Sequence, residues 1–322
     1  MNIITALNKR YIPYTVVMIT SLAINNKVPI DVYLLHSELS KEDLSSIKKA
    51  LDDYHITIHE LFVERRLFSS KLPCNDQWSV ETYYRLMMLD LLPENVDRIL
   101  YLDGDMVING SLKDIYDLDF AGMDIVACDD KCGLNTVESY GPKNRSMLKE
   151  AYESGYRYFN AGVMLMNLRQ MRDNYSFKTY LDAIEAWNYE MEAPDQDILN
   201  WVHWKKVGYI DCQVYDLFAR VAHNAGITYE EVKKAVIIVH FAGAKPWDND
   251  GFHFDIERIW WDYAKYTPYY EKLLNDFVDS AMKDKTIAIF LEKLLQDNSE
   301  LRRTLKSIKE QMDRLTREKL EL

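Results

Sequence analysis

The stretch Arg98-Ile99-Leu100-Tyr101-Leu102-Asp103-Gly104-Asp105-Met106-Val107 decides how the rest of the chain is interpreted. Its apolar half has the length of a buried strand, and the strand ends in two carboxylates. Side chains alternate along a strand, so Asp103 and Asp105 can point the same way, with Gly104 leaving room for a ligand near the backbone. Two adjacent carboxylates repel unless a cation lies between them, and oxygen ligands suit Mg²⁺, Mn²⁺ or Ca²⁺. A polar turn after a strand is the simpler alternative, and Val107 excludes the usual calcium loop.

The composition limits the class of protein. The chain has 322 residues, 48% of them hydrophobic, which suffices for one large domain or a domain plus an appendage. Its formal net charge of −12 argues against binding to nucleic acid. No signal peptide or membrane-length apolar run is visible, so we expect a cytoplasmic protein. The cysteines match no zinc spacing and are interpreted as ordinary thiols: Cys74, Cys128, Cys132 and Cys212.

Strand and helix patterns alternate along the chain. Strands are predicted at residues 2–6, 30–35, 56–62 and 125–128 and before Asp103, and helices at residues 14–25, after Ser40 and at 82–92. This alternation predicts an α/β fold with a mostly parallel sheet and helices on both faces. Ligands bind beyond the carboxyl ends of strands in such sheets, which points to Asp103, Asp105 and the loop of residues 7–11.

Two later segments supply polar candidates. Residues 158–167 begin with a small polar loop, in which Asn160 either serves turn chemistry or contacts a ligand. Asp195-Gln196-Asp197 follows a proline and is either the acidic first turn of a helix or a source of polar groups for a pocket. Residues 129–150 are polar and irregular, which predicts a mobile flap.

A second strand also ends in a potential metal ligand. The apolar residues 236–239 lead into His240, and Gly243 and Lys245 follow. A lone histidine at a strand end is commonly a hydrogen-bonded core residue, but the carboxylate pair on another strand end favours a shared metal site. Two carboxylates and an imidazole form a mixed shell that favours Mn²⁺ over Ca²⁺. Lys245 would neutralise phosphates held by that metal, so the set predicts a metal diphosphate site.

These segments together resemble the family 8 glycosyltransferases, the group that contains glycogenin and the bacterial lipooligosaccharide α-galactosyltransferases. The matching segments occur in family order and are residues 3–6 with Tyr11, Tyr84-Arg85-Leu86, Tyr101 to Asp105, Phe159 to Val163, Asp195-Gln196-Asp197 and His240 to Trp247. Asn8 and Arg10 depart from the Asp and Asn of the bacterial galactosyltransferases. The spacing from His240 to Lys245 is one residue shorter than in glycogenin.

The resemblance implies a GT-A fold, a Rossmann-like α/β domain, that uses a UDP-sugar and Mn²⁺, with Mg²⁺ as the alternative. It implies a metal held by Asp103, Asp105 and His240. It places the uridine beside Ala6, Asn8 and Tyr11, and the diphosphate beside Gly243 and Lys245. The residues that it places around the donor sugar are Arg85, Asp103, Asn160, Asp195 and Gln196. Gly104 and Ala161 complete the expected substrate-binding residues.

The activity implied by the resemblance is transfer of a hexose from UDP-glucose or UDP-galactose to a glycan or glycolipid acceptor, in bacterial surface polysaccharide or glycoprotein glycan synthesis. The family retains the α configuration, either by double displacement through an enzyme nucleophile or by attack of the acceptor on the same face. We favour the second route, because glutamine is a poor nucleophile. Gln196 would then position and stabilise the reacting groups, and Asp195 would hold sugar hydroxyls.

Two alternatives belong to other classes of protein. A strand followed by D-x-D-x-V also resembles the first motif of haloacid-dehalogenase-type phosphatases, with Asp103 as the nucleophile and Asp105 as the acid. That family usually begins near this motif, and it would leave the stretch from His240 to Trp247 unexplained. The other alternative is a scaffold protein that acts through a C-terminal coiled coil.

The C-terminal tail has a pattern of its own. Apolar residues recur three and four apart from Leu291 to Leu322, which predicts a coiled coil, and Asn298 at an a position favours a parallel homodimer. A membrane-surface helix is another interpretation, with the protein at the inner face of the membrane. The predicted divisions are a catalytic domain at residues 1–250, a helical extension packed on it at 251–285 and an oligomerisation helix at 286–322.

Overall fold

The computed structural model describes residues 1–74, 79–130, 136–248 and 253–283, with residues 303, 305–307, 309 and 310. The predicted coiled coil therefore lies almost entirely outside the described residues, and the homodimer and the three predicted divisions stay predictions. The described residues of 1–246 and 250–272 form one compact unit, and those of 247–249 and 273–322 are grouped as a second. The candidate site is built from residues of the first unit.

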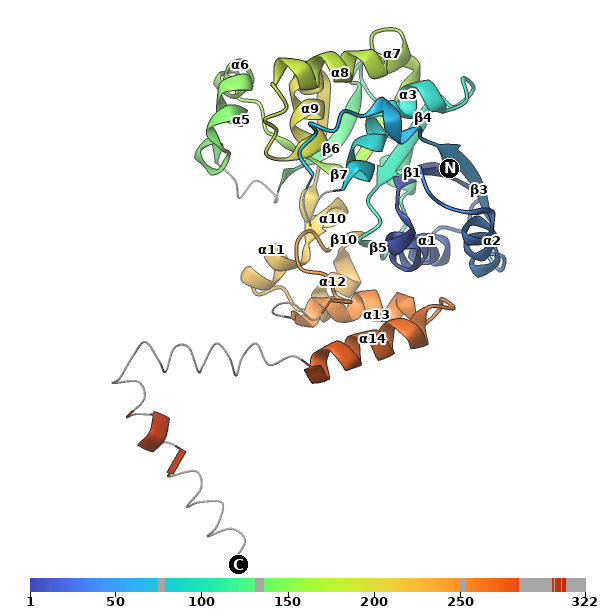
Figure 1. Cartoon of the computed structure of the whole chain (residues 1–322), viewed down its shortest axis with the longest axis vertical. Helices are drawn as coiled ribbons and strands as arrows, with labels where there is room; N and C mark the ends of the chain where they lie inside the picture. The colour runs from blue at the N-terminus through green and yellow to red at the C-terminus, as the bar shows by residue number, and fades with distance from the viewer. Residues whose placement is uncertain are drawn as a thin grey trace, which may run out of the picture. The chain divides into compact units, whose positions relative to one another are not determined.

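The strands belong to two sheets. Their bounds are β1 (Asn2–Ala6), β2 (Ile30–His36), β3 (Ile56–Phe62), β4 (Arg98–Leu102), β5 (Met106–Ile108), β6 (Ile125–Asp129), β7 (Phe159–Asn167), β8 (Val207–Ile210), β9 (Leu217–Phe218) and β10 (Ile238–His240). Among the described residues, seven strands form the main sheet in the order β3-β2-β1-β4-β7-β6-β8, and three form a small sheet, β5-β10-β9. Figure 1 labels β4 and β7 of the main sheet and β5 and β10 of the small one. In the main sheet β7 runs antiparallel to β4 and β6 and the other pairs are parallel, which confirms a mostly parallel sheet.

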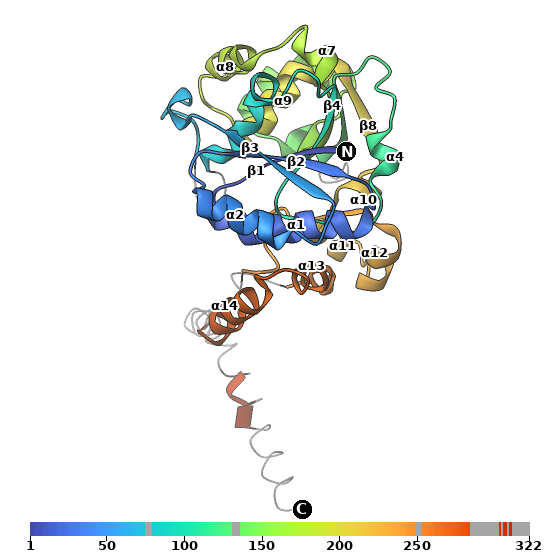
Figure 2. The same cartoon turned by 90° about the vertical axis from the view of Figure 1, so that its right-hand side faces the viewer.

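Helices cover both faces of the main sheet, as predicted. Figure 2 shows α1 and α2 on one face and α8 and α9 on the other. The α-helices are α1 (Ile12–Asn25), α2 (Lys41–Ala50), α3 (Met88–Leu91), α4 (Lys113–Tyr116), α5 (Pro142–Met147), α6 (Lys149–Glu153), α7 (Leu168–Arg172), α8 (Phe177–Ala186), α9 (Pro194–His203), α10 (Cys212–Tyr215), α11 (Ala219–Asn224), α12 (Tyr229–Ala235), α13 (Arg258–Ala264) and α14 (Tyr270–Lys283). The 3₁₀ helices are η1 (Lys9–Tyr11), η2 (Arg65–Leu67), η3 (Val80–Met87), η5 (Val137–Ser139), η6 (Trp204–Lys206) and η7 (Asp255–Glu257).

The central strand β4 explains why the apolar run ends where it does. Ile99 and Tyr101 belong to the hydrophobic cluster on one face of the sheet, and Leu100 and Leu102 belong to the cluster on the other. A strand buried on both faces has to be apolar at every position, because an unpaired polar group there costs free energy. The carboxylates therefore begin only where the strand leaves the core, at Asp103.

Local signals predicted α2 correctly. Ser40 accepts a hydrogen bond from the Asp43 backbone N–H, and the Asp43 side chain accepts one from the Ser40 backbone N–H, which completes the capping box. The helix predicted at residues 82–92 is instead the 3₁₀ helix η3 followed by the short α3. Side chains of η3 make contacts that are distant in sequence, among them the bond from the Tyr84 hydroxyl to Ser37.

Two segments predicted to be irregular have regular structure. Among the described residues of 129–150, η5 and α5 are helical and Asn144 of α5 donates a buried hydrogen bond to Asp197, while the mobility of the flap stays a prediction. Asn160 lies within β7 and not in a turn before it, and its side-chain oxygen accepts the backbone N–H of Gly162. In both segments polar side chains have partners that are distant in sequence or buried.

Candidate active site

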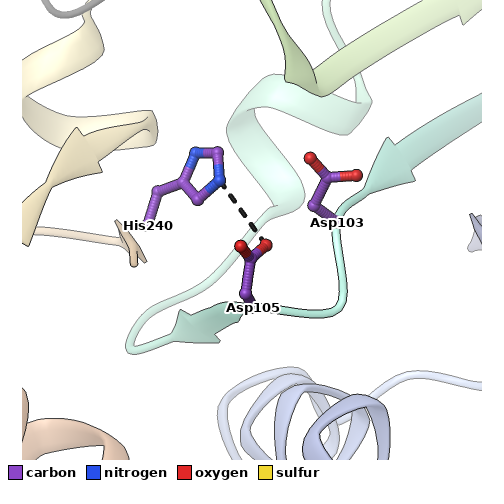
Figure 3. Close-up of side chains that lie close together, drawn as sticks. All are labelled: Asp103, Asp105 and His240. Atoms are coloured by element: carbon purple, nitrogen blue, oxygen red, sulfur yellow. Dashed lines mark ion pairs between the residues drawn. The ribbon is translucent and has the colours of Figure 1, made fainter. Parts of the chain in front are cut away.

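Two strand ends bring the predicted metal ligands together. Asp103 and Asp105 lie between β4 and β5, and His240 ends β10, which pairs antiparallel with β5 so that His240 is opposite Met106. The Phe241 backbone N–H donates to the Asp105 carbonyl at 3.0 Å and closes this junction. One ligand atom from each of Asp103, Asp105 and His240 lies within 4.8 Å of the others (Figure 3). The convergence predicted from two separate strand ends is therefore present.

The charges in this cluster are strongly coupled. His240 Nε2 lies 3.5 Å from Asp105 Oδ1, and the Lys245 ammonium forms an ion pair with the other oxygen of Asp105. Burial acts to raise the pKa of Asp105, but Lys245 and His240 hold it well below its usual range. Burial acts to lower the pKa of His240, but Asp216 and Asp105 raise it to about 10. The site thus keeps Asp105 ionised, with the positive charges of Lys245 and His240 beside it.

Two glycines leave the space that these side chains occupy. A Cβ at Gly162 would lie 2.7 Å from His240 Cε1 and 2.8 Å from Met106 Cε, so β7 can pass the imidazole only without a side chain. A Cβ at Gly104 would lie 2.7 Å from Thr15 Oγ1. Gly104 is therefore required by the packing of α1 against the carboxylate loop, a reason that the sequence alone did not reveal.

Arg85 joins the carboxylate loop to the start of α9. Its Nη2 donates to Asp103 at 2.9 Å, its Nε lies 2.9 Å from Asp195 Oδ2, and its Nη1 donates to the Ala161 carbonyl at 2.6 Å. The Tyr101 hydroxyl also donates to Asp103, at 2.9 Å. Burial raises the pKa of Asp195 to about 6, although Arg85 acts against that rise. Arg85 therefore fixes two candidate donor-sugar carboxylates in one geometry.

Gln196 is held by the neighbouring strand. Its Oε1 accepts hydrogen bonds from the Ala161 backbone N–H at 2.9 Å and from Asn160 Nδ2 at 3.1 Å. Asn160 Nδ2 also donates to Asp130 Oδ1 at 3.2 Å. Asn160, Ala161 and Gln196 are therefore in mutual contact. Together with the ion pair of Asp195 and Arg85, these contacts support the interpretation that this segment supplies polar groups to a pocket and is not only the acidic first turn of a helix.

The loop of residues 7–11 approaches the carboxylate loop around Gly104 through Tyr11. β1 is the parallel neighbour of β4, as expected, and Tyr11 Cδ1 would lie 3.6 Å from a Cβ at Gly104. Asn8 caps η1 by accepting the Tyr11 backbone N–H at 3.1 Å, and no bond from its side chain to the carboxylate cluster occurs among the described residues. Ala6 ends β1 just before this loop, and Gly243, with φ +91, turns the chain from His240 to Lys245.

Sequence reasoning missed two buried carboxylates of the site. Asp130 follows the end of β6, so the rule that polar groups gather at strand ends would have found it. Asp216 Oδ1 lies 2.8 Å from His240 Nδ1, and the carboxylate is 1% exposed. A single aspartate before a two-residue strand gives no sequence signal, because its importance depends on the pairing of β9 with β10.

The comparisons with known proteins agree with this geometry. The model of Glycosyl transferase family 8 matches residues 2–251, so the chain belongs to this family. Its fold is the GT-A fold: the structure of the galactosyltransferase LgtC in complex with donor and acceptor sugar analogues matches with a TM-score of 0.69 and 25% identity, over 83% of this chain and 96% of that one. Because the chain belongs to this glycosyltransferase family, we no longer consider the haloacid-dehalogenase-type phosphatase alternative.

Curated relatives of the chain are also glycosyltransferases by name. The chain is 25% identical to the lipopolysaccharide 1,2-glucosyltransferase of Escherichia coli K12, over 77% of this chain and 72% of that protein. It is 27% identical to the lipopolysaccharide 1,3-galactosyltransferase of Salmonella typhimurium, over 56% of this chain and 53% of that protein. The protein is therefore a glycosyltransferase of family 8.

The donor set suits a divalent cation. Asp105 is ionised, His240 presents Nε2 toward it, and Asp103 is anchored by Arg85, so two carboxylates and one imidazole are fixed around one point. Oxygen ligands with one imidazole fit Mn²⁺ and Mg²⁺ better than a soft metal.

Among the described helices, none has the length and apolarity to cross a membrane.

Proposed function

We propose that this glycosyltransferase moves a hexose, glucose or galactose, from a UDP-sugar to a glycan or glycolipid acceptor with retention of configuration. The observation that carries the proposal is the cluster of Asp103, Asp105 and His240 with Lys245 beside it. Two carboxylates and an imidazole suit a divalent cation, and a lysine next to them suits the diphosphate that the cation would hold. Mn²⁺ is the proposed metal and Mg²⁺ the alternative.

Each group of the site then has a defined task. A divalent cation bound there would neutralise the negative charge that develops on the departing diphosphate. Lys245, within hydrogen-bond reach of the Phe241 carbonyl at 2.9 Å, holds a second positive charge beside that position. Tyr11 and the loop after Ala6 lie on the α1 side of the carboxylates, where we propose that the uridine binds, with Asn8 shaping the loop.

The donor sugar is proposed to bind against the Arg85 network. Asp195 is 3% exposed and paired with Arg85, so its role is to hold sugar hydroxyls in a fixed direction. Gln196 already accepts two hydrogen bonds, from Ala161 and Asn160, so we assign it a positioning task and not that of a nucleophile. Both assignments favour attack of the acceptor on the same face as the leaving diphosphate. A glycosyl adduct on Asp195 found by mass spectrometry would overturn this route.

The biological setting is proposed from the relatives. The two lipopolysaccharide glycosyltransferases named above support an acceptor in bacterial surface polysaccharide synthesis, with a protein-linked glycan as the alternative. We propose that the protein acts in the cytoplasm, with peripheral contact at the inner face of the membrane. We also propose that the protein forms a homodimer through residues 286–322. The molar mass of the full-length protein, measured by light scattering, tests this proposal.

Release of UDP tests the reaction class. The full-length protein is incubated with a panel of UDP-sugars, with either Mn²⁺ or EDTA, and an Asp105→Asn variant is run beside it. We expect slow UDP release from one hexose donor, only with Mn²⁺, and none from the variant. Asp119→Asn is the matched control, since this exposed carboxylate bonds only the Ala121 backbone N–H among the described residues. Release that persists in EDTA and in the Asp105→Asn variant would contradict the proposal.

A further inference from the structure

The imidazole of His240 is fixed from three sides. Its Nδ1 lies 2.8 Å from Asp216 Oδ1. The Phe218 ring meets it edge-on, with ring centroids 4.9 Å apart and planes inclined at 78°. On the β7 side, Gly162 leaves room for Cε1 and for nothing larger, since a Cβ there would be 2.7 Å away. The ring therefore has little freedom to turn, and its Nε2 is directed toward Asp105.

One short segment supplies two of these three contacts. Asp216 follows α10, and β9 begins at the next residue and pairs in parallel with β10, with Phe218 opposite His240. The Asp216 backbone N–H donates to the Cys212 carbonyl at 3.1 Å, which fixes the start of the segment. The carboxylate and the aromatic ring are thus delivered together to the strand that carries the metal ligand.

Burial makes the placement of Asp216 informative. The residue is 1% exposed, and a carboxylate removed from water to this degree costs free energy unless it is paired and hydrogen-bonded. The imidazole N–H of His240 is a partner at hydrogen-bond distance, 2.8 Å from Asp216 Oδ1. An apolar residue would fill the same space without this cost, so the carboxylate has a purpose other than packing.

We propose that Asp216 is a positioning residue for the metal site. It accepts a hydrogen bond from Nδ1–H of His240, which keeps a ring proton on Nδ1, so that Nε2, 3.5 Å from Asp105 Oδ1, is the nitrogen that would release its proton and hold the cation. A carboxylate behind a ligating histidine orients the ring and raises its basicity, and its loss typically weakens metal binding about 10- to 100-fold. This inference rests on the proposed function, because it requires a cation held by His240.

The chain offers a matched control at another Asp and His pair. Asp124 Oδ2 lies 3.3 Å from His203 Nδ1, and both side chains are fully buried, as at Asp216 and His240. Asp124 is next to the end of β7 at Asn167, seven residues from Asn160 of the site, which corresponds to roughly 20 Å along a strand. Removing either carboxylate takes away the partner of Nδ1 in a buried imidazole, but only one of the two imidazoles faces the metal site.

The experiment measures Mn²⁺ affinity directly. Full-length protein with saturating UDP is titrated with MnCl₂, and free Mn²⁺ is followed by electron paramagnetic resonance. We expect the Kd for Mn²⁺ to rise about 10- to 100-fold in Asp216→Ala and to stay unchanged in Asp124→Ala. Asp216→Asn, whose amide oxygen can accept the same hydrogen bond without charge, should fall between Asp216→Ala and the wild type. Thermal unfolding of all variants shows that a change in affinity is not a loss of folded protein.

Each outcome has a distinct meaning. A Kd in Asp216→Ala within twofold of the wild type would overturn the positioning role and leave the proposed function intact. Absence of Mn²⁺ binding by the wild type in the presence of UDP would overturn both. If Asp216→Ala does not fold, Asp216→Asn decides, and an unchanged Kd and unchanged spectrum of bound Mn²⁺ in that variant would overturn the role. An equal loss of affinity in Asp124→Ala would also overturn it, since the effect would then be a general consequence of stability.

Discussion

The contact between Gly104 and Thr15 allows a sharp test of how the carboxylate loop is held. An added methyl group in Gly104→Ala would lie 2.7 Å from Thr15 Oγ1, a distance at which something has to shift. Thr15 is 1% exposed, and its hydroxyl has no hydrogen-bond partner among the described residues. Deleting that hydroxyl therefore removes the obstacle without breaking a polar contact.

The expected magnitudes follow from these distances. Overpacking of a buried site costs about 1–3 kcal/mol, so Gly104→Ala should destabilise the fold by that amount. In a Thr15→Ala background the nearest remaining atom of residue 15 is Cβ, at 3.7 Å from the new methyl group, which is ordinary van der Waals contact. The cost of Gly104→Ala should then fall to about 0.5 kcal/mol or less, which corresponds to a favourable coupling of at least about 0.5 kcal/mol and up to about 2.5 kcal/mol.

Urea unfolding of the four proteins in this double-mutant cycle measures the coupling, provided that the m-values agree. Thr15→Val is the matched control, because it replaces the hydroxyl with a methyl group of similar size and should not rescue Gly104→Ala. Mn²⁺-dependent UDP release should recover together with stability in the rescued double variant. Equal costs of Gly104→Ala in the wild-type and Thr15→Ala backgrounds would refute the packing explanation.

Three further predictions concern the same site. The raised pKa of Asp195, about 6, means that protonation below pH 6 weakens its ion pair with Arg85; kcat/KM should fall as pH drops through 6, and Asp195→Asn should lack this acid limb. Arg85→Lys keeps the charge but cannot reach both Asp103 and Asp195, so kcat in the UDP-release assay and Mn²⁺ affinity should both fall about 10- to 100-fold. Gly162→Ala should weaken Mn²⁺ binding about tenfold by displacing His240, whereas Gly208→Ala, with 3.3 Å to its nearest atom, should not; equal effects of the two would contradict the steric argument.

Local sequence signals predicted much of the fold. The capping box at Ser40 and the apolar run of β4 depend on neighbours within a few residues, and both are present as expected. The convergence of the carboxylate loop with His240 was also predictable, because strand ends of one α/β domain lie near each other. These features need no knowledge of which distant side chains meet.

The other features of the fold and the site involve contacts between residues that are far apart in the chain, and local sequence patterns do not predict such contacts. Asn144 of the short helix α5 donates to Asp197, which lies 53 residues further along the chain, and Asn160 belongs to β7, which pairs with β4 and β6. The role of Asp216 depends on the pairing of β9 with β10. The reason for a glycine at position 104 also differs from the prediction. The sequence suggested that Gly104 leaves room for a ligand, whereas a Cβ at this position would lie closest to an atom of α1.

The central claim is that Asp103, Asp105 and His240 hold a cation through which a nucleoside diphosphate binds. Isothermal titration of the full-length protein with UDP, in Mn²⁺ and again in EDTA, tests it most directly, with Asp105→Asn as the variant. We predict measurable UDP binding in Mn²⁺ that is lost in EDTA and in Asp105→Asn. UDP binding of equal affinity with and without the metal, or retained in full by the variant, would contradict the claim.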